Sequence, residues 1–148
     1  MNELLPAIAL DVGEARIGFA ASDSLGRFAF PKGYHIRSKL ELDVTAIKDF
    51  LEAEHALTVI VGLPLRTDGA DSPQTLKVRS FASALEAAGL NVILQDERFS
   101  TRIATQSLLA GSNRKKRQEK GRTDEASAIS ILETWHEKQR IKSAWANL

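Results

Sequence analysis

The sequence predicts an α/β fold in which helices flank a five-stranded mixed sheet. Three short apolar segments come first with only turn residues between them, and the two later strands alternate with amphipathic helices. Closely spaced strands form antiparallel hairpins, whereas a helical crossover makes two strands parallel. We therefore expect three antiparallel strands followed by two parallel ones. A chain of 148 residues with no visible repeat or linker is expected to form one domain over 1–148.

Short apolar runs identify the first three strands. Residues 7–10 predict a buried strand that ends at Asp11, and residues 17–21 predict its hairpin partner. The third strand lies within 27–37, where one proline and one glycine weaken the pattern. Because proline cannot donate a ladder hydrogen bond, this strand is expected at an edge of the sheet.

Helices and strands alternate in the rest of the chain. In the helix expected over 40–54, Val44 and Ile47 lie on the apolar side and Asp43 is expected to face solvent. Strands are expected over 58–61 and 91–94, with a helix between them that is begun by Ser72 and Pro73 and ended by Gly89. A further helix is expected from Ser100 or Thr101 to about Ala110. Thr123 is expected to cap a last helix, whose inner side carries Ile129, Leu132 and Trp135 or His136.

Positive charge is concentrated in one expected loop, residues 111–122. This basic segment holds six basic residues and one acid, whereas the rest of the chain holds 14 basic and 18 acidic residues. Such a charge run is either a solvated loop or a contact for a polyanion. Residues 140–148 are expected to form a short C-terminal tail. The basic residues are Arg114, Lys115, Lys116, Arg117, Lys120 and Arg122.

Composition excludes several classes of protein. The chain has no cysteine, which excludes a disulfide scaffold, a thiolate zinc site and a cysteine nucleophile. Its N-terminal residues lack the basic and apolar regions of a signal peptide, and no apolar run approaches the ~20 residues that span a bilayer. We therefore expect a cytoplasmic protein.

Three acidic residues occupy the ends of predicted elements. Asp11 ends the first strand, Glu97 follows the last strand, and Asp124 opens the last helix. If the first strand lies beside the strand over 58–61, all three can meet where the strands' carboxyl ends form one edge of the sheet. Taken singly, each has a simpler interpretation: a turn aspartate, a surface glutamate paired with Arg98, and a helix-start carboxylate.

Together, these acids would form a site for divalent cations. Carboxylates held close together repel one another, and a cation relieves that repulsion. Oxygen donors without cysteine or clustered histidine suit Mg²⁺ or Mn²⁺ better than Zn²⁺. Two such ions can activate water and stabilise the leaving oxygen of a phosphodiester. The acids therefore predict metal-dependent hydrolysis with two ions.

Four motifs resemble one known family. They are Asp11-Val-Gly-Glu-Ala-Arg-Ile-Gly18, Val61-Gly-Leu-Pro-Leu65, Asp96-Glu-Arg-Phe-Ser-Thr101 and Thr123-Asp-Glu-Ala-Ser-Ala128. In this order they are typical of the YqgF (RuvX) family, and the resemblance covers about residues 7–136. It implies an RNase H-like fold and a metal-dependent nuclease that acts on the 5′ end of precursor 16S rRNA or on a Holliday junction. The catalytic and metal-binding roles carry over to Asp11, Glu97 and Asp124.

The resemblance also implies where nucleic acid is held. Beside the acids, basic and hydroxyl side chains are expected to contact phosphates, and the basic segment now favours substrate contact over a solvated loop. A Holliday junction would require paired active sites and therefore a homodimer. The expected nucleic-acid contacts are Arg16, Arg98, Ser100, Thr101, Arg114, Lys115, Lys116, Arg117, Lys120 and Arg122.

Two other functions fit parts of the sequence. Asp11-Val-Gly13 resembles the phosphate hairpin of sugar kinases and heat-shock ATPases, but the chain has room for only one such domain and contains no P-loop motif. A non-catalytic nucleic-acid or ribosome-assembly factor would keep the fold for binding alone, and the intact acids argue against it.

Aromatic side chains are few, and most of them are expected in the core. Phe28 and Phe30 on the expected edge strand could stack on nucleobases, although packing in a core or a dimer interface is the preferred interpretation.

Overall fold

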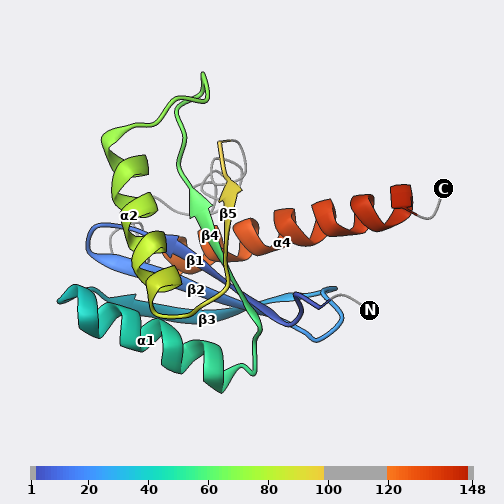
Figure 1. Cartoon of the computed structure of the whole chain (residues 1–148), viewed down its shortest axis with the longest axis horizontal. Coiled ribbons are helices and arrows are strands. Elements are labelled where there is room, and N and C mark those ends of the chain that lie inside the picture. Colours follow the sequence, from blue (N-terminus) through green and yellow to red (C-terminus); the bar gives the residue numbers. More distant parts are fainter. Residues whose placement is uncertain (1–2, 99–119, 147–148) are drawn as a thin grey trace.

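The computed structural model describes residues 3–98 and the backbone of 120–146, with side chains from Asp124 onward. Its five strands form one sheet in the order β3-β2-β1-β4-β5. The expected helix from Ser100 or Thr101 to Ala110 lies outside the described residues. The elements are β1 (Ala7–Val12), β2 (Arg16–Ser22), β3 (Ala29–Ile36), α1 (Leu40–Ala53), β4 (Thr58–Leu63), α2 (Pro73–Ala87), β5 (Val92–Asp96) and α4 (Lys120–Ala146) (Figure 1).

Strand pairing confirms the predicted mixed sheet. β2 is antiparallel to both β1 and β3, whereas β4 is parallel to both β1 and β5. β3 lies at one edge, as its proline and glycine predicted. Because β1, β4 and β5 are parallel, their carboxyl ends lie together along one side of the sheet, which we name the carboxyl edge.

Alternation along the strands sends their side chains into two different cores. Ile8 and Leu10 of β1 join the core formed with α1 and α2, while Ala7 and Ala9 join the core formed with α4. Figure 1 shows α1 and α2 on one face of the sheet and α4 across the other. The second face, which we name the α4 face, packs Ala7, Ala9, Ala20 and Ile60 against Ala128, Ile131, Leu132 and Trp135.

Local sequence signals correctly place α2. The Ser72 hydroxyl accepts a hydrogen bond from the Thr75 backbone N–H at 3.1 Å, and the Thr75 side chain completes a capping box. Pro73 is the first helical residue. Gly89 follows the helix with a φ of 92°, a left-handed conformation that ends helices.

The last helix is longer than predicted at both ends. It begins at Lys120, so Thr123 is not its cap and Asp124 lies beyond its first turn. A backbone amide at that depth has an acceptor within the helix, so the start does not depend on a cap at position 123. Residues 120–122 of the expected loop therefore belong to α4, and residues 111–119 lie outside the described residues.

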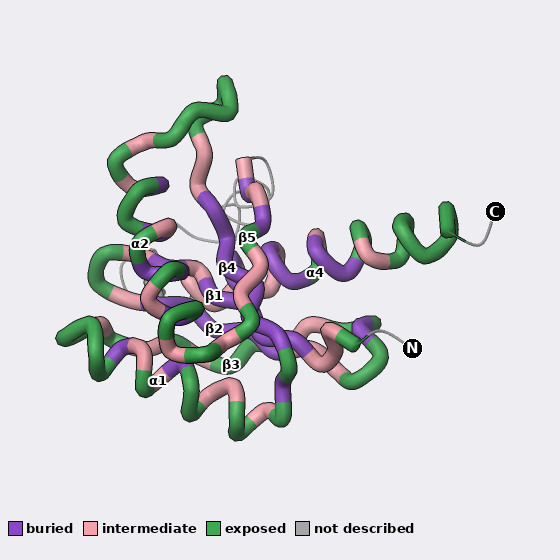
Figure 2. Tube along the Cα trace, viewed as in Figure 1, coloured by how far each residue is buried: buried purple, intermediate pink, exposed green. Residues whose placement is uncertain are grey.

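The helix also continues through the expected tail as far as Ala146, and its last turns are exposed (Figure 2). Despite the length of α4, none of the helices within the described ranges is both long enough and apolar enough to cross a membrane.

Asp43 on α1 is a second departure from prediction, because it is fully buried rather than solvent-facing. Its carboxylate accepts a hydrogen bond from the Ser38 backbone N–H at 2.9 Å and bonds His35 Nε2 at 2.9 Å and Arg37 Nε at 3.3 Å. Burial raises the pKa of this carboxyl, but the hydrogen bonds outweigh burial and hold the pKa below its ordinary value. A buried carboxylate is tolerated here because its partners satisfy it.

Candidate active site

The α4 face carries the predicted acids at the carboxyl edge. Asp11 follows Ala7 and Ala9 at two-residue spacing, which places its side chain on that face. Glu97 comes directly after β5, and its backbone N–H donates to the carbonyl oxygen of Leu63, the last residue of β4. Asp124 belongs to α4 itself. The fold therefore brings elements that are far apart in the chain to one place.

Gly18 of β2 is where α4 comes closest to the sheet beside Asp11. Gly18 and Asp11 are paired residues in the β1–β2 ladder. A Cβ atom on Gly18 would overlap the backbone oxygen of Asp124 and would lie 3.0 Å from the Asp124 Cβ. The missing side chain therefore allows α4 to hold Asp124 close to the end of β1.

Gly62 of β4 plays the matching role beside Glu97. A Cβ atom on Gly62 would lie 2.7 Å from Glu97 Oε2 and would overlap the Ile131 side chain of α4. Glu97 is only 7% exposed, so it is not the surface residue that one interpretation of the sequence allowed. Both glycines occur in the motifs quoted above, and their role is to make room for acids.

The three acids interact electrostatically. Burial, together with the negative charges of Glu97 and Asp124, raises the pKa of Asp11 from 3.8 to about 8. A carboxyl with this pKa is mostly protonated at neutral pH, because ionising it would add a further negative charge to a poorly solvated site. A nearby cation would remove that penalty. Strongly shifted pKa values of this kind are typical of functional sites.

Arg16 supplies positive charge at the same place. Its Nε lies 3.3 Å from Asp124 Oδ2, and both side chains are largely buried. Within the described parts of the chain, no three acidic or histidine side chains are drawn together closely enough to hold a metal ion. The donor set nevertheless fits Mg²⁺ or Mn²⁺, since it offers carboxylate oxygens, and Asp11 is costly to ionise without a cation.

Arg98 does not form the pair with Glu97 that the sequence left open. Its Nε donates to Asp96 Oδ2 at 2.9 Å, and its backbone N–H donates to Asp96 Oδ1 at 3.0 Å. The hydrogen bond from Arg98 lowers the pKa of Asp96, and the same bond raises the pKa of Arg98. The predicted contacts Ser100, Thr101, Arg114, Lys115, Lys116 and Arg117, and the side chains of Lys120 and Arg122, lie outside the described residues.

Arg37 supports the end of β1, a role that sequence reasoning missed. Its Nη1 donates to the Gly13 carbonyl at 2.9 Å, while its Nε bonds the buried Asp43 at 3.3 Å. Gln74 Nε2 donates to the carbonyl of Val12 at 3.2 Å. These bonds fix the residues that follow Asp11. They join segments far apart in the chain, so no local sequence pattern signals them.

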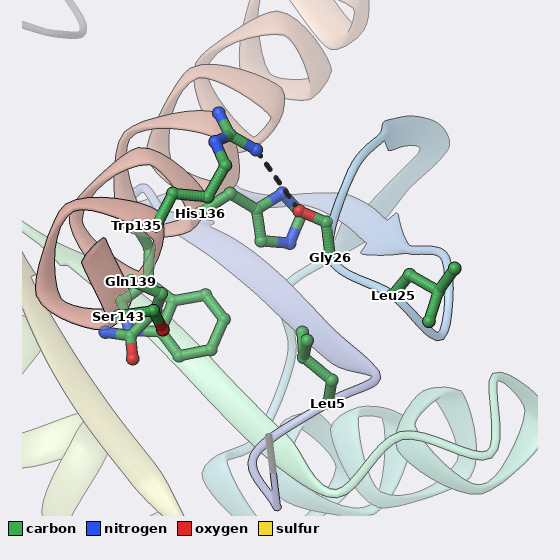
Figure 3. A pocket seen from close by; sticks show the side chains of 8 residues that line it. Leu5, Leu25, Gly26, Trp135, His136, Gln139 and Ser143 are labelled. Carbon is green, nitrogen blue, oxygen red and sulfur yellow. Dashed lines mark hydrogen bonds between the residues drawn. The ribbon is translucent and has the colours of Figure 1, made fainter. Parts of the chain in front are cut away.

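A separate pocket of about 200 Å³ lies beside the C-terminal half of α4 (Figure 3). The buried His136 lines it, and burial together with the charge of Arg140 lowers the pKa of its imidazole. None of the predicted site residues lines this pocket, so it is distinct from the acids at the carboxyl edge. Its walls are Leu5, Leu25, Gly26, Trp135, His136, Gln139, Arg140 and Ser143.

The sheet order, with helices on both faces, defines the RNase H-like fold class, and two solved structures share this fold. The RuvC of Thermus thermophilus in complex with a Holliday junction aligns over 92% of this chain and 96% of its own, with a TM-score of 0.58 and 11% identity. The Fowlpox virus resolvase in complex with Holliday junction DNA aligns over 91% and 99%, with a TM-score of 0.55 and 11% identity. At such identities, the likeness shows the fold alone.

The chain belongs to the RuvX family, whose model is described as Holliday junction resolvase and matches residues 6–138. A Thermus thermophilus protein named "Putative pre-16S rRNA nuclease" is 45% identical over 86% of this chain and 93% of its own length. "Ribonuclease YqgF" of Deinococcus radiodurans is 43% identical over 88% of each chain. The chain therefore belongs to a family whose relatives are named as nucleases.

Proposed function

We propose that this chain is a divalent-metal-dependent endonuclease that hydrolyses phosphodiester bonds in structured nucleic acid. The placement of Asp11, Glu97 and Asp124 on one face of the carboxyl edge, where Glu97 and Asp124 act electrostatically on Asp11, carries this proposal. The raised pKa of Asp11 supports it, because burial and the negative charges of Glu97 and Asp124 make ionisation of Asp11 unfavourable without a cation. The family and the names of the relatives support nuclease chemistry.

Each of these side chains has a distinct task in the proposed reaction. The three carboxylates would hold Mg²⁺ or Mn²⁺, two ions in our proposal, and the ions would supply activated water and stabilise the leaving oxygen. Asp11 would release its proton when positive charge reaches the site. Arg16 neutralises Asp124 in the metal-free state. The Arg16 guanidinium, held beside Asp124, would also bind a phosphate of the substrate.

The basic segment would hold the substrate on either side of the cut. Four of its six basic residues precede α4, and Lys120 and Arg122 lie at the start of α4, which also carries Asp124. Phosphate contacts of this kind position nucleic acid without reading its sequence. Arg98 and the segment from Ser100 onward would contribute from the β5 side. In this proposal the protein acts in the cytoplasm on nucleic acid.

Precursor 16S rRNA is the substrate that we favour, because several relatives with 35–45% identity carry that name. Resolution of a Holliday junction is the second candidate, since the family model is described in those terms. A junction requires two coordinated cuts and therefore a homodimer with paired sites, whereas a ribosomal RNA end requires one site. The oligomeric state thus bears on the choice.

Cleavage assays test the proposal directly. We expect purified protein with Mg²⁺ or Mn²⁺ to cut a labelled precursor-rRNA end fragment faster than a four-way DNA junction. The Asp124→Asn variant should lose cleavage on both substrates by roughly a hundredfold or more while still binding them, because it removes a ligand oxygen and not the basic segment.

Wild type and Asp124→Asn must be purified side by side, so that a contaminating nuclease would appear in both. Faster cutting of the junction would reverse the substrate preference. Binding without cleavage in any metal would instead indicate a non-catalytic assembly factor.

A further inference from the structure

Tyr34 on the edge strand β3 lies next to the predicted acids. The β2–β3 ladder pairs Tyr34 with Gly18, the residue that contacts Asp124. The Arg16 guanidinium carbon lies 5.7 Å from the centre of the Tyr34 ring, and the same guanidinium pairs with Asp124. One chain of contacts therefore runs from the phenol ring through Arg16 to the candidate metal site.

A β-bulge turns Tyr34 toward this side of the sheet. Pro31 pairs with Ala20 on the α4 face, and strict alternation from Pro31 would place Tyr34 on the opposite face. The register shifts between Gly18 and Ala20, and Gly33 has a φ of 81°, as the extra residue of a bulge often does. The bulge also brings the Gly33 backbone N–H to the Glu125 side chain, beside Asp124. Bulges often re-aim a side chain next to an active site.

The Tyr34 ring is accessible even though it lies beside buried groups. It is 47% exposed, and its neighbour on the same face of the strand, Ile36, is 69% exposed. β3 is the edge strand, so among the described residues no strand lies beyond this pair. Tyr34 is therefore an exception to the general expectation that most aromatic side chains lie in the core. An exposed aromatic ring beside an arginine is the combination with which proteins stack unpaired bases.

We propose that Tyr34 is a stacking platform for an unpaired nucleobase next to the scissile phosphate. A base in a continuous duplex presents no free face to such a ring, whereas a base in a single strand, a frayed end or a branch point does. This proposal rests on the proposed nuclease function. It deepens that function by stating that the substrate carries an unpaired nucleotide at the site.

Binding measurements in an Asp11→Asn background test the proposal without cleavage. The probes are a single-stranded RNA of about 12 nucleotides and the same sequence as a full duplex. We expect Tyr34→Ala and Tyr34→Leu to weaken single-strand binding by about 5- to 100-fold, which corresponds to the loss of one stacked base. Tyr34→Phe should stay within about twofold of the parent, because the ring is kept. Duplex affinity should not depend on any of these changes.

Phe28→Ala is the matched control, because Phe28 is an exposed aromatic residue (58%) that precedes β3 at the end away from the acids. It should leave single-strand affinity unchanged. Unchanged single-strand binding in both Tyr34→Ala and Tyr34→Leu, or equal losses for single strand and duplex, would overturn the proposal. Since the ring is half-exposed, both variants should keep the parent's thermal unfolding midpoint.

A photocrosslink separates stacking from indirect effects. An RNA strand that carries 5-iodouridine should crosslink to the peptide containing Tyr34, and the Tyr34→Leu variant should lose that crosslink. A crosslink to a different peptide that is unaffected by Tyr34→Leu would contradict stacking. If the crosslink forms and wild type cuts no substrate, the nuclease proposal fails, and Tyr34 stacks on a bound base that has no scissile phosphate beside it. If wild type cuts its substrate and Tyr34→Leu binds the single strand as tightly as the parent does, the stacking proposal fails and the nuclease proposal stands.

Discussion

Replacing Asp11 with Asn should abolish cleavage and at the same time stabilise the metal-free protein. The cleavage rate should fall by roughly a thousandfold or more, because a ligand of the proposed ions is removed. The free energy of unfolding at pH 7, measured with a chelator present, should rise by about 1 to 3 kcal/mol. Asp11 lowers stability there because it is ionised in the unfolded chain and costly to ionise in the folded one.

The pH dependence gives the sign of this effect. Folding raises the pKa of Asp11 from 3.8 to about 8. The stabilising contribution of Asp11 to the free energy of unfolding is therefore fully present below about pH 4, and it is lost as the pH rises toward 8. Chemical denaturation of wild type and Asp11→Asn from pH 4 to pH 8.5 should show the variant gaining relative stability across this window. A variant less stable than wild type at pH 8 would refute the electrostatic strain that we assign to the site.

Replacing Gly18 with Ala should cost both stability and activity. The added methyl group would overlap the backbone of Asp124, and backbone cannot move aside as a flexible side chain can. We expect the free energy of unfolding to fall by about 2 to 4 kcal/mol. Cleavage by the fraction that remains folded should fall by about a hundredfold, because displacement of α4 moves Asp124 away from Asp11. Thermal unfolding and cleavage assays measure the two effects.

Gly89→Ala is the control for this substitution. Gly89 has a positive φ, but nothing lies within 4 Å of an added Cβ, so only backbone strain of about 1 kcal/mol is expected. It lies after α2, away from the acids, and cleavage should not change. If Gly18→Ala cost no more than Gly89→Ala and left cleavage intact, then close approach of α4 would not be what positions Asp124.

The mixed sheet and the location of the acids were predictable because each depends on local signals. The short links and the helical crossovers determined which strands pair antiparallel and which pair parallel. The proline in β3 predicted that this strand lies at an edge of the sheet. Asp11 and Glu97 come at the ends of strongly apolar strands, and parallel strands collect such ends at one edge. The predicted start of the last helix, Asp124, was wrong by four residues, since Thr123 resembles a cap but lies within α4, which begins at Lys120.

Other features depend on contacts that alternation and helical spacing do not reveal. Asp43 is buried because Ser38, His35 and Arg37 fold back onto it. No pattern in the sequence singled out Tyr34, and its orientation follows from a bulge that shifts the register of β3. The close approach of α4 at Gly18 likewise depends on two elements that are distant in the chain.

Binding of Mn²⁺ is the measurement that tests the central claim most directly. Electron paramagnetic resonance of free Mn²⁺, titrated with protein at pH 8, reports bound ions without any need for a substrate. We expect wild type to bind Mn²⁺, and we expect Asp11→Asn and Asp124→Asn to lose most of that binding while remaining folded. Absence of binding by wild type, or undiminished binding by both variants, would show that these acids do not form the metal site.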